Sequence, residues 1–233
     1  MDEEKKNNQG KKVKKKVTKQ EKKVERQLIR ILIFFGFLVV LFFVASLIFQ
    51  KFSKIEYEGL TFTKEKFGQL TFYHYYYYFP SESGAINRYN LYLRNDPRYN
   101  DVRLVQNAPI EFESSGRNKS SVMMTINVPS DLGQCSESFA AIGTLAGFLS
   151  DNEIKVKSGV MNPVEAILQN RTYATCENQD TSVIQITSGE ETWIEINKSC
   201  HTITIGPDCN VMKAIEKYEV HTILDSKVGT ISP

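Results

Sequence analysis

The sequence has few of the residues and motifs that mark an enzyme. It contains three histidines, 13 glycines and 7 prolines in 233 residues, and its 41% apolar and 24% charged residues exclude collagen-like and wholly disordered chains. It has no Gly-x-Ser-x-Gly elbow, no His-Glu-x-x-His motif, no phosphate-binding loop and no Asp-x-Asp-x-Asp-Gly calcium loop. We therefore predict no catalytic residues, no metal site and no cofactor.

Cysteine is missing from the first 134 residues, and all four cysteines lie beyond them: Cys135, Cys176, Cys200 and Cys209. An even number of cysteines in one part of a chain favours two disulfides formed in an oxidising compartment. Pairing of sequence neighbours, Cys135 with Cys176 and Cys200 with Cys209, is slightly favoured because Gly206-Pro207 offers a turn. Zinc is the alternative, and the lack of any Cys-x-x-Cys pair weakens it.

Long hydrophobic runs are also rare, and the single one is Ile31–Phe49, where Ser46 is the only polar side chain. Nineteen helical residues span about 28 Å, close to the roughly 30 Å of a bilayer's hydrocarbon core. A core helix of a soluble domain would show a polar face, which this run lacks. We predict one transmembrane helix over residues 31–50.

Charge is divided unevenly along the chain. Residues 1–30 hold 12 Lys and Arg against 5 Asp and Glu, whereas the remaining residues hold 17 against 22. Because basic residues resist translocation, we predict a disordered cytoplasmic tail over residues 1–30 that contacts anionic inner-leaflet lipids, and a type II signal anchor in the cell membrane. A signal peptide cleaved near Val44-Ala45-Ser46 and nucleic-acid binding by the tail are weaker alternatives, and we expect no nucleic acid.

The exported part, residues 51–233, predicts an α+β fold. Residues 51–129 contain alternating or aromatic-rich segments that predict an antiparallel sheet of about five strands, with a turn at residues 64–68. These segments are Ile55–Phe62, Gln69–Phe79, Ile86–Leu93, Val102–Phe112 and Ser121–Val128.

Residues 130–233 predict a mixed α/β region. Apolar residues at three- and four-residue steps between Phe139 and Leu149 indicate a helix, preceded by candidate caps at Ser130, Asp131 and Ser136. A short helix follows the cap Asn162 and Pro163, and Asp208 can cap a final helix. Short strands lie between these helices.

Several segments resemble an uncharacterised family of small archaeal single-pass membrane proteins. They are Asn90–Val102, Cys135–Ser138, Tyr173–Cys176, and the stretch from Cys200 through Cys209 into Ala214–Lys217. The resemblance covers most of residues 55–224, with His201 as a departure where the family carries an aromatic residue. It implies an exported domain tethered to a membrane, and no biochemical activity.

Two clusters are candidate binding sites. In a strand over Phe72–Phe79, the side chains of Tyr73, Tyr75 and Tyr77 share one face, and such rings could stack on sugars or anchor a partner, or one face could pack the core. The cluster Arg94, Asp96 and Arg98 could bind an anionic glycan or phosphate, or form a structural turn at Asp96-Pro97. A catalytic triad of Ser138, His201 or His221, and Asp96 can be drawn, but no spacing favours it.

Three acceptor sequons, at Asn118, Asn170 and Asn197, lie in the exported part and are glycosylation candidates. Taken together, the sequence predicts a structural or interaction module of the cell envelope, anchored in the lipid bilayer and bound to an unknown envelope protein or glycan. The alternatives are a tethered enzyme acting on envelope polymers or peptides, and a carbohydrate-binding module that uses the tyrosine-rich strand.

Overall fold

The computed structural model of the chain describes residues 24, 26–45, 53–81, 83–110, 112, 121–126, 135–177 and 182–229. The chain forms two compact units, Met1–Lys54 and Ile55–Pro233. Most of the basic tail and Asn118 lie outside the described residues.

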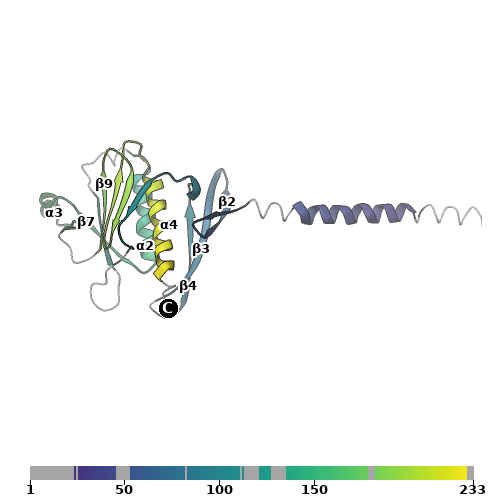
Figure 1. Cartoon of the computed structure of the whole chain (residues 1–233), viewed down its shortest axis with the longest axis horizontal. Helices are drawn as coiled ribbons and strands as arrows, with labels where there is room; N and C mark the ends of the chain where they lie inside the picture. The colour runs from purple at the N-terminus through teal and green to yellow at the C-terminus, as the bar shows by residue number, and fades with distance from the viewer. Residues whose placement is uncertain are drawn as a thin grey trace, which may run out of the picture. The chain divides into compact units, whose positions relative to one another are not determined.

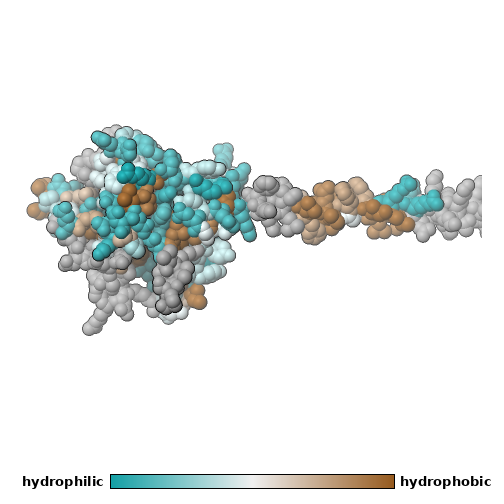
Figure 2. Space-filling view, in the orientation of Figure 1, coloured by the Kyte–Doolittle hydropathy of each residue, from teal (hydrophilic) through white to brown (hydrophobic). Residues whose placement is uncertain are grey.

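The first unit contains an apolar helix, Arg26–Ala45, of which no part is buried. Its 20 residues are long and apolar enough to cross a membrane, and its surface is predominantly apolar in Figure 2. The helix begins earlier than the predicted residue 31, and the predicted residues 46–50 lie outside the described range.

The second unit has three layers, in which two helices lie between two sheets (Figure 1). One outer layer is a four-stranded sheet in the order β1-β2-β3-β4. Its strands are β1 (Lys54–Tyr57), β2 (Leu60–Phe67), β3 (Leu70–Pro80) and β4 (Ile86–Leu93). The central layer contains α2 (Ser138–Asp151) and α4 (Val211–Gly229), so both helices have neighbours on two sides.

Two tight turns shape the four-stranded sheet. Glu58 and Gly59 have φ values of 48° and 78°, and they separate β1 from β2 inside the segment predicted as one strand. Gly68, with φ of 64°, begins the turn between β2 and β3. The predicted turn at residues 64–68 is therefore wrong except at Gly68, because β2 continues to Phe67 and the left-handed glycine alone sets the reversal.

The other outer layer is a seven-stranded mixed sheet in the order β5-β10-β11-β9-β6-β7-β8. Its elements, with the short helix α3 and a 3-10 helix before it in the chain, have these bounds: η1 (Pro97–Tyr99), β5 (Arg103–Gln106), β6 (Ser121–Ile126), β7 (Lys155–Val160), α3 (Pro163–Gln169), β8 (Thr172–Tyr173), β9 (Ser182–Ser188), β10 (Trp193–Asn197) and β11 (Cys200–Ile205). The pair β10–β11 is antiparallel, and the other pairs in this sheet are parallel.

The α+β class predicted from the sequence is therefore present, but two strands belong to the other sheet. β5 and β6 were expected in an antiparallel sheet of five strands; instead β5 pairs in parallel with β10, and β6 with β7 and β9. For β6 the reason is the crossover through α2, which returns the chain to the same end of the sheet and makes β6 and β7 parallel.

The helix caps agree with the prediction at α3 and differ from it at α2. Asn162 caps α3 as predicted, accepting hydrogen bonds from the backbone amides of Val164 and Glu165 at 2.9 and 3.3 Å. For α2 the N-cap is Glu137, without a side-chain cap bond, rather than Ser136. Asp208 accepts hydrogen bonds from Thr192 Oγ1 and Asn210 Nδ2, both at 2.5 Å, ahead of α4.

One continuous core joins all three layers of the second unit. It contains Phe62 and Leu91 from the four-stranded sheet, Leu145 from α2, Ile215 from α4 and Ile184 from the mixed sheet, each almost fully buried. Burying one such side chain contributes about 1.5–3 kcal/mol. Because this core lies entirely within Ile55–Pro233, we expect that unit to fold without the apolar helix.

The four cysteines form two disulfides, Cys135–Cys209 and Cys176–Cys200, with Cα–Cα distances of 5.4 and 5.3 Å. The predicted pairing of sequence neighbours is wrong. The physical reason is that α2 and α4 lie side by side in the central layer, which places the segments before them, at Cys135 and Cys209, next to each other. An exposed apolar helix together with disulfides is characteristic of a membrane-anchored or secreted protein.

Candidate functional site

The outer face of the four-stranded sheet carries an exposed ladder of rings. Leu91 and Leu93 of β4 are buried and lie opposite Tyr75 and Tyr73, so those tyrosines face the core. The alternate side chains of β3 therefore point away from the helices. With one ring each from β2 and β4 they form what we call the aromatic face: Phe67, Phe72, His74, Tyr76, Tyr78 and Tyr92.

The rings of the aromatic face contact one another in a continuous series. Phe67 and Phe72 are 5.7 Å apart between centroids, and Phe72 and Tyr92 are 6.4 Å apart. His74 stacks on Tyr92 at 4.4 Å, and Tyr76 lies 6.0 Å from Tyr78. Such edge-to-face and stacked pairs each contribute about 0.5–1.5 kcal/mol beyond their burial. The rings therefore hold one another in place before any partner binds.

Polar side chains lie among these rings. His74 is placed between Glu65 Oε1, 2.8 Å from its Nδ1, and Asn90 Oδ1, 3.1 Å from its Nε2. The Arg88 guanidinium lies 4.3 Å above the ring of Tyr76. Tyr76 and Tyr78 are nevertheless 50% and 61% exposed. A ligand that met this face would find ring surfaces beside hydrogen-bonding groups, the combination that is enriched at protein interfaces.

The predicted stripe Tyr73, Tyr75 and Tyr77 is the inner one. All three side chains pack against the core, and Tyr77 donates a hydrogen bond to Asn152 Oδ1 at 2.5 Å. Burial raises the pKa of Tyr77, so its hydroxyl stays protonated. Alternation shows which residues share a face and not which face meets the core, so the sequence alone could not place this stripe on the inner face.

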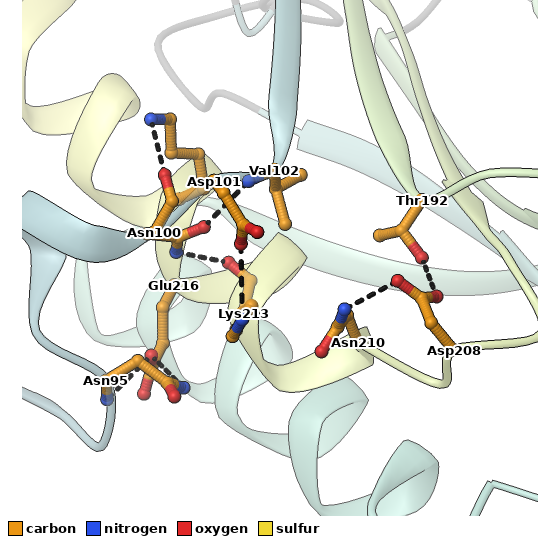
Figure 3. Close-up of polar contacts among 10 residues, drawn as sticks. Asn95, Asn100, Asp101, Val102, Thr192, Asp208, Asn210, Lys213 and Glu216 are labelled. Atoms are coloured by element: carbon orange, nitrogen blue, oxygen red, sulfur yellow. Dashed lines mark hydrogen bonds and ion pairs between the residues drawn. The ribbon is translucent and has the colours of Figure 1, made fainter.

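The segment that carries the second predicted cluster is held against α4 through Asn95 and Asn100 (Figure 3). Glu216 of α4 is 2% exposed and accepts hydrogen bonds from the backbone amide of Arg94 and from both nitrogens of Asn95, at 3.1 and 2.8 Å. Asn100 Nδ2 donates to the Lys213 carbonyl at 2.8 Å. These bonds hold the segment after β4 against the central helix layer.

Arg94, Asp96 and Arg98 themselves make structural contacts. Arg98 Nη2 lies 2.6 Å from Asp96 Oδ2, and Asp96 caps η1 by accepting from the Arg98 amide. The Arg98 hydrogen bond lowers the pKa of Asp96 below its usual value. Arg94 Nη1 lies 3.2 Å from Glu137 Oε1 on the surface. The geometry supports the structural alternative for this cluster, a turn held by its own ion pair.

The triad drawn from the sequence is not assembled around His201. His201 is buried; its Nε2 donates to the Lys198 carbonyl at 2.6 Å, so its Nδ1 accepts from Tyr218 Oη at 2.6 Å. Burial lowers the pKa of His201 to about 4, which keeps the ring neutral. With both ring nitrogens engaged and Asp96 paired to Arg98, neither residue is placed to activate Ser138.

Glu219 of α4 is a feature that the sequence analysis missed. It is fully buried, and neither of its side-chain oxygens has a hydrogen-bond partner in the described part of the chain. Burial, reinforced by the charge of Glu216, raises its pKa to about 8. Acidic residues in helices are ordinarily exposed, and nothing in the sequence around Glu219 indicates that its side chain points inward.

The glycosylation candidates Asn170 and Asn197 are both exposed, at the end of α3 and at the end of β10. Among the described residues there is no group of three or more His, Cys, Asp or Glu side chains that could hold a metal ion.

Comparison of the chain with protein-family models, with curated proteins and with solved structures finds no match.

Proposed function

We propose that the chain is an interaction module of the cell envelope, anchored by its apolar helix, with a cytoplasmic N-terminus and residues 54–233 outside. The apolar helix is exposed along its whole length and has the span of a bilayer crossing. Residues 1–30 hold 12 Lys and Arg against 5 Asp and Glu, whereas both disulfides follow the apolar helix. The resemblance to small archaeal single-pass membrane proteins supports the same arrangement.

The aromatic face is the observation that carries the interaction role. Exposed large rings in a contiguous patch are uncommon on proteins that bind nothing, and tyrosine combines a wide contact area with a polar tip. Figure 1 shows α2 and α4 on the opposite side of this sheet, and Tyr78 and Phe67 are 61% and 56% exposed. We propose that another envelope protein docks here, with inner-leaflet lipids bound by the lysine-rich tail.

A glycan is the second candidate partner. Arg88 lies against Tyr76, and Asn90 and Glu65 lie against His74, so hydrogen-bonding side chains flank exposed rings. Sugar rings bind to such combinations by stacking on an aromatic ring while their hydroxyls bond to neighbouring polar groups.

Topology is tested by protease protection on intact cells. Protease added outside is expected to digest the chain beyond residue 60 and to leave an epitope tag at the N-terminus intact. The external segment is accessible, whereas the tail is shielded by the membrane. Cells permeabilised with detergent serve as the control and should lose the tag. Digestion of the tag in intact cells would contradict the proposed orientation.

The aromatic face is tested by photo-crosslinking in the native membrane. Tyr78 of the full chain is replaced by benzoylphenylalanine, a conservative aromatic change, and the matched control carries it at Ile167 on α3, which is 82% exposed. Irradiation is expected to give a discrete adduct from position 78 only, identified by mass spectrometry. A glycosidase-sensitive adduct would favour the glycan. Equal adducts from both positions, or none from position 78, would argue against a docking role.

A further inference from the structure

A cavity lies where the C-terminal ends of α2 and α4 meet the four-stranded sheet. Its volume is about 510 Å³, which is within the 300–1,000 Å³ or so of small-molecule sites. Its wall is mainly apolar, formed by side chains from β3, from α2 and the residues after it, from α4 and from the segment after β5: Phe79, Ile110, Phe112, Phe148, Ile154 and Ile223. An apolar ligand portion would lose water on entering it.

The polar side chains of this wall differ in how many of their hydrogen-bonding atoms already have partners. Asn152 accepts from Tyr77 and donates to the Phe148 carbonyl at 2.7 Å. Asp225 Oδ2 accepts from Gln106 Nε2 at 2.5 Å and from the Ile110 amide at 2.8 Å. In the described part of the chain, no hydrogen bond reaches Asp225 Oδ1, and no basic side chain lines the cavity.

A second acidic group lies behind the same wall. Glu219 precedes Ile223 by four residues on α4, so their side chains follow each other on one helix face. Its two oxygens are buried and have no partner in the described part of the chain. Only the Asp225 carboxylate therefore brings negative charge to the cavity wall, since the pKa of about 8 keeps most of Glu219 protonated at pH 7. Because no basic side chain among the described residues lines the cavity, this carboxylate favours a cation and disfavours an anion.

We propose that this cavity binds an amphipathic amine, whose apolar body contacts Phe79, Phe148 and Ile223 and whose ammonium group pairs with Asp225. An ammonium group supplies the N–H donors that Asp225 Oδ1 lacks. The cavity is separate from the aromatic face, so this inference does not depend on the partner proposed there.

The test uses residues 54–233, which contain the complete core and both disulfides. Octylamine and octanoate, matched in chain length and opposite in charge, are titrated at pH 7 by calorimetry below their micelle concentrations. Octylamine is expected to bind about tenfold more tightly, which corresponds to about 1.4 kcal/mol. Asp225→Asn keeps the acceptor oxygen for Gln106 and Ile110, and it should reduce this preference to less than about twofold.

Two further variants make the result decisive. Asp101→Asn removes a carboxylate that pairs with Lys213 away from the cavity, and it should leave the preference unchanged. Ser226→Phe narrows the cavity from α4 without touching the bonds of Asp225, and it should abolish binding of octylamine; its thermal unfolding confirms that it is folded. Equal binding of the two probes, no binding of octylamine, or an equal effect of Asp101→Asn would overturn the proposal.

Discussion

Replacing Cys135 and Cys209 together by serine is expected to lower the free energy of unfolding of residues 54–233 by about 4 kcal/mol. This disulfide spans 74 residues, so it removes much of the freedom of the unfolded chain. The bond also joins the segments that precede α2 and α4, the two helices of the central layer. Urea denaturation of the oxidised protein, followed by circular dichroism, measures the change.

The second disulfide is the matched control. Cys176–Cys200 spans 24 residues, and its double serine variant is expected to lose about 3 kcal/mol because the closed loop is shorter. The same variants check the pairing. After removal of Cys135 and Cys209, the remaining cysteines should stay oxidised and resist thiol labelling. Two labelled thiols in that variant would show that Cys176 and Cys200 are not partners in the native protein.

Glu219→Gln is expected to stabilise residues 54–233 by about 4 kcal/mol at pH 8, with little effect near pH 4.5. The buried carboxyl has a pKa of about 8, above its ordinary value of 4.5. Below pH 4.5 the group is protonated in both the folded and unfolded states. Between pH 4.5 and 8 only the unfolded state releases the proton, so stability falls as pH rises. Glutamine cannot ionise, and the variant should not show this fall.

The measurement is clearest above pH 6.5. His201 has a folded pKa of about 4, below its ordinary 6.5, so it contributes stability that is lost only as pH falls from 6.5 towards 4. Between pH 6.5 and 8 the wild-type protein should lose about 1.4 kcal/mol per pH unit more than Glu219→Gln does. Urea denaturation at intervals of half a pH unit gives both curves. Parallel curves would contradict a raised pKa at Glu219.

Glu216→Gln is the control, because it makes the same replacement at another buried glutamate of α4. Glu216 is also buried, but three hydrogen bonds from Arg94 and Asn95 stabilise its side chain. Replacing one of its oxygens by an amide nitrogen removes an acceptor and places a donor opposite an N–H group. The variant is therefore expected to destabilise the protein by about 1–3 kcal/mol, whereas the glutamine at position 219 stabilises it.

The sequence predicted those local features of the fold that depend on interactions between residues close together along the chain. The apolar run over Ile31–Phe49 predicts a helix by length and composition alone, and the described part of that run, residues 31–45, is helical. Asn162 before Pro163 predicts a capped helix start, because the cap bond involves residues two and three positions apart. The alternation in Phe72–Phe79 predicts two stripes, since successive side chains in a strand point to opposite faces.

Only the tertiary structure decided which strands pair, which cysteines bond and which side chains are buried. Strand pairing uses backbone hydrogen bonds that every residue except proline offers, so the sequence could not show that β5 and β6 join the mixed sheet. The disulfide partners, the outward direction of Tyr76 and Tyr78, and the burial of Glu219 depend in the same way on two sheets enclosing α2 and α4. A residue's type sets its local preferences, whereas its exposure and its partners are set by the elements packed against it.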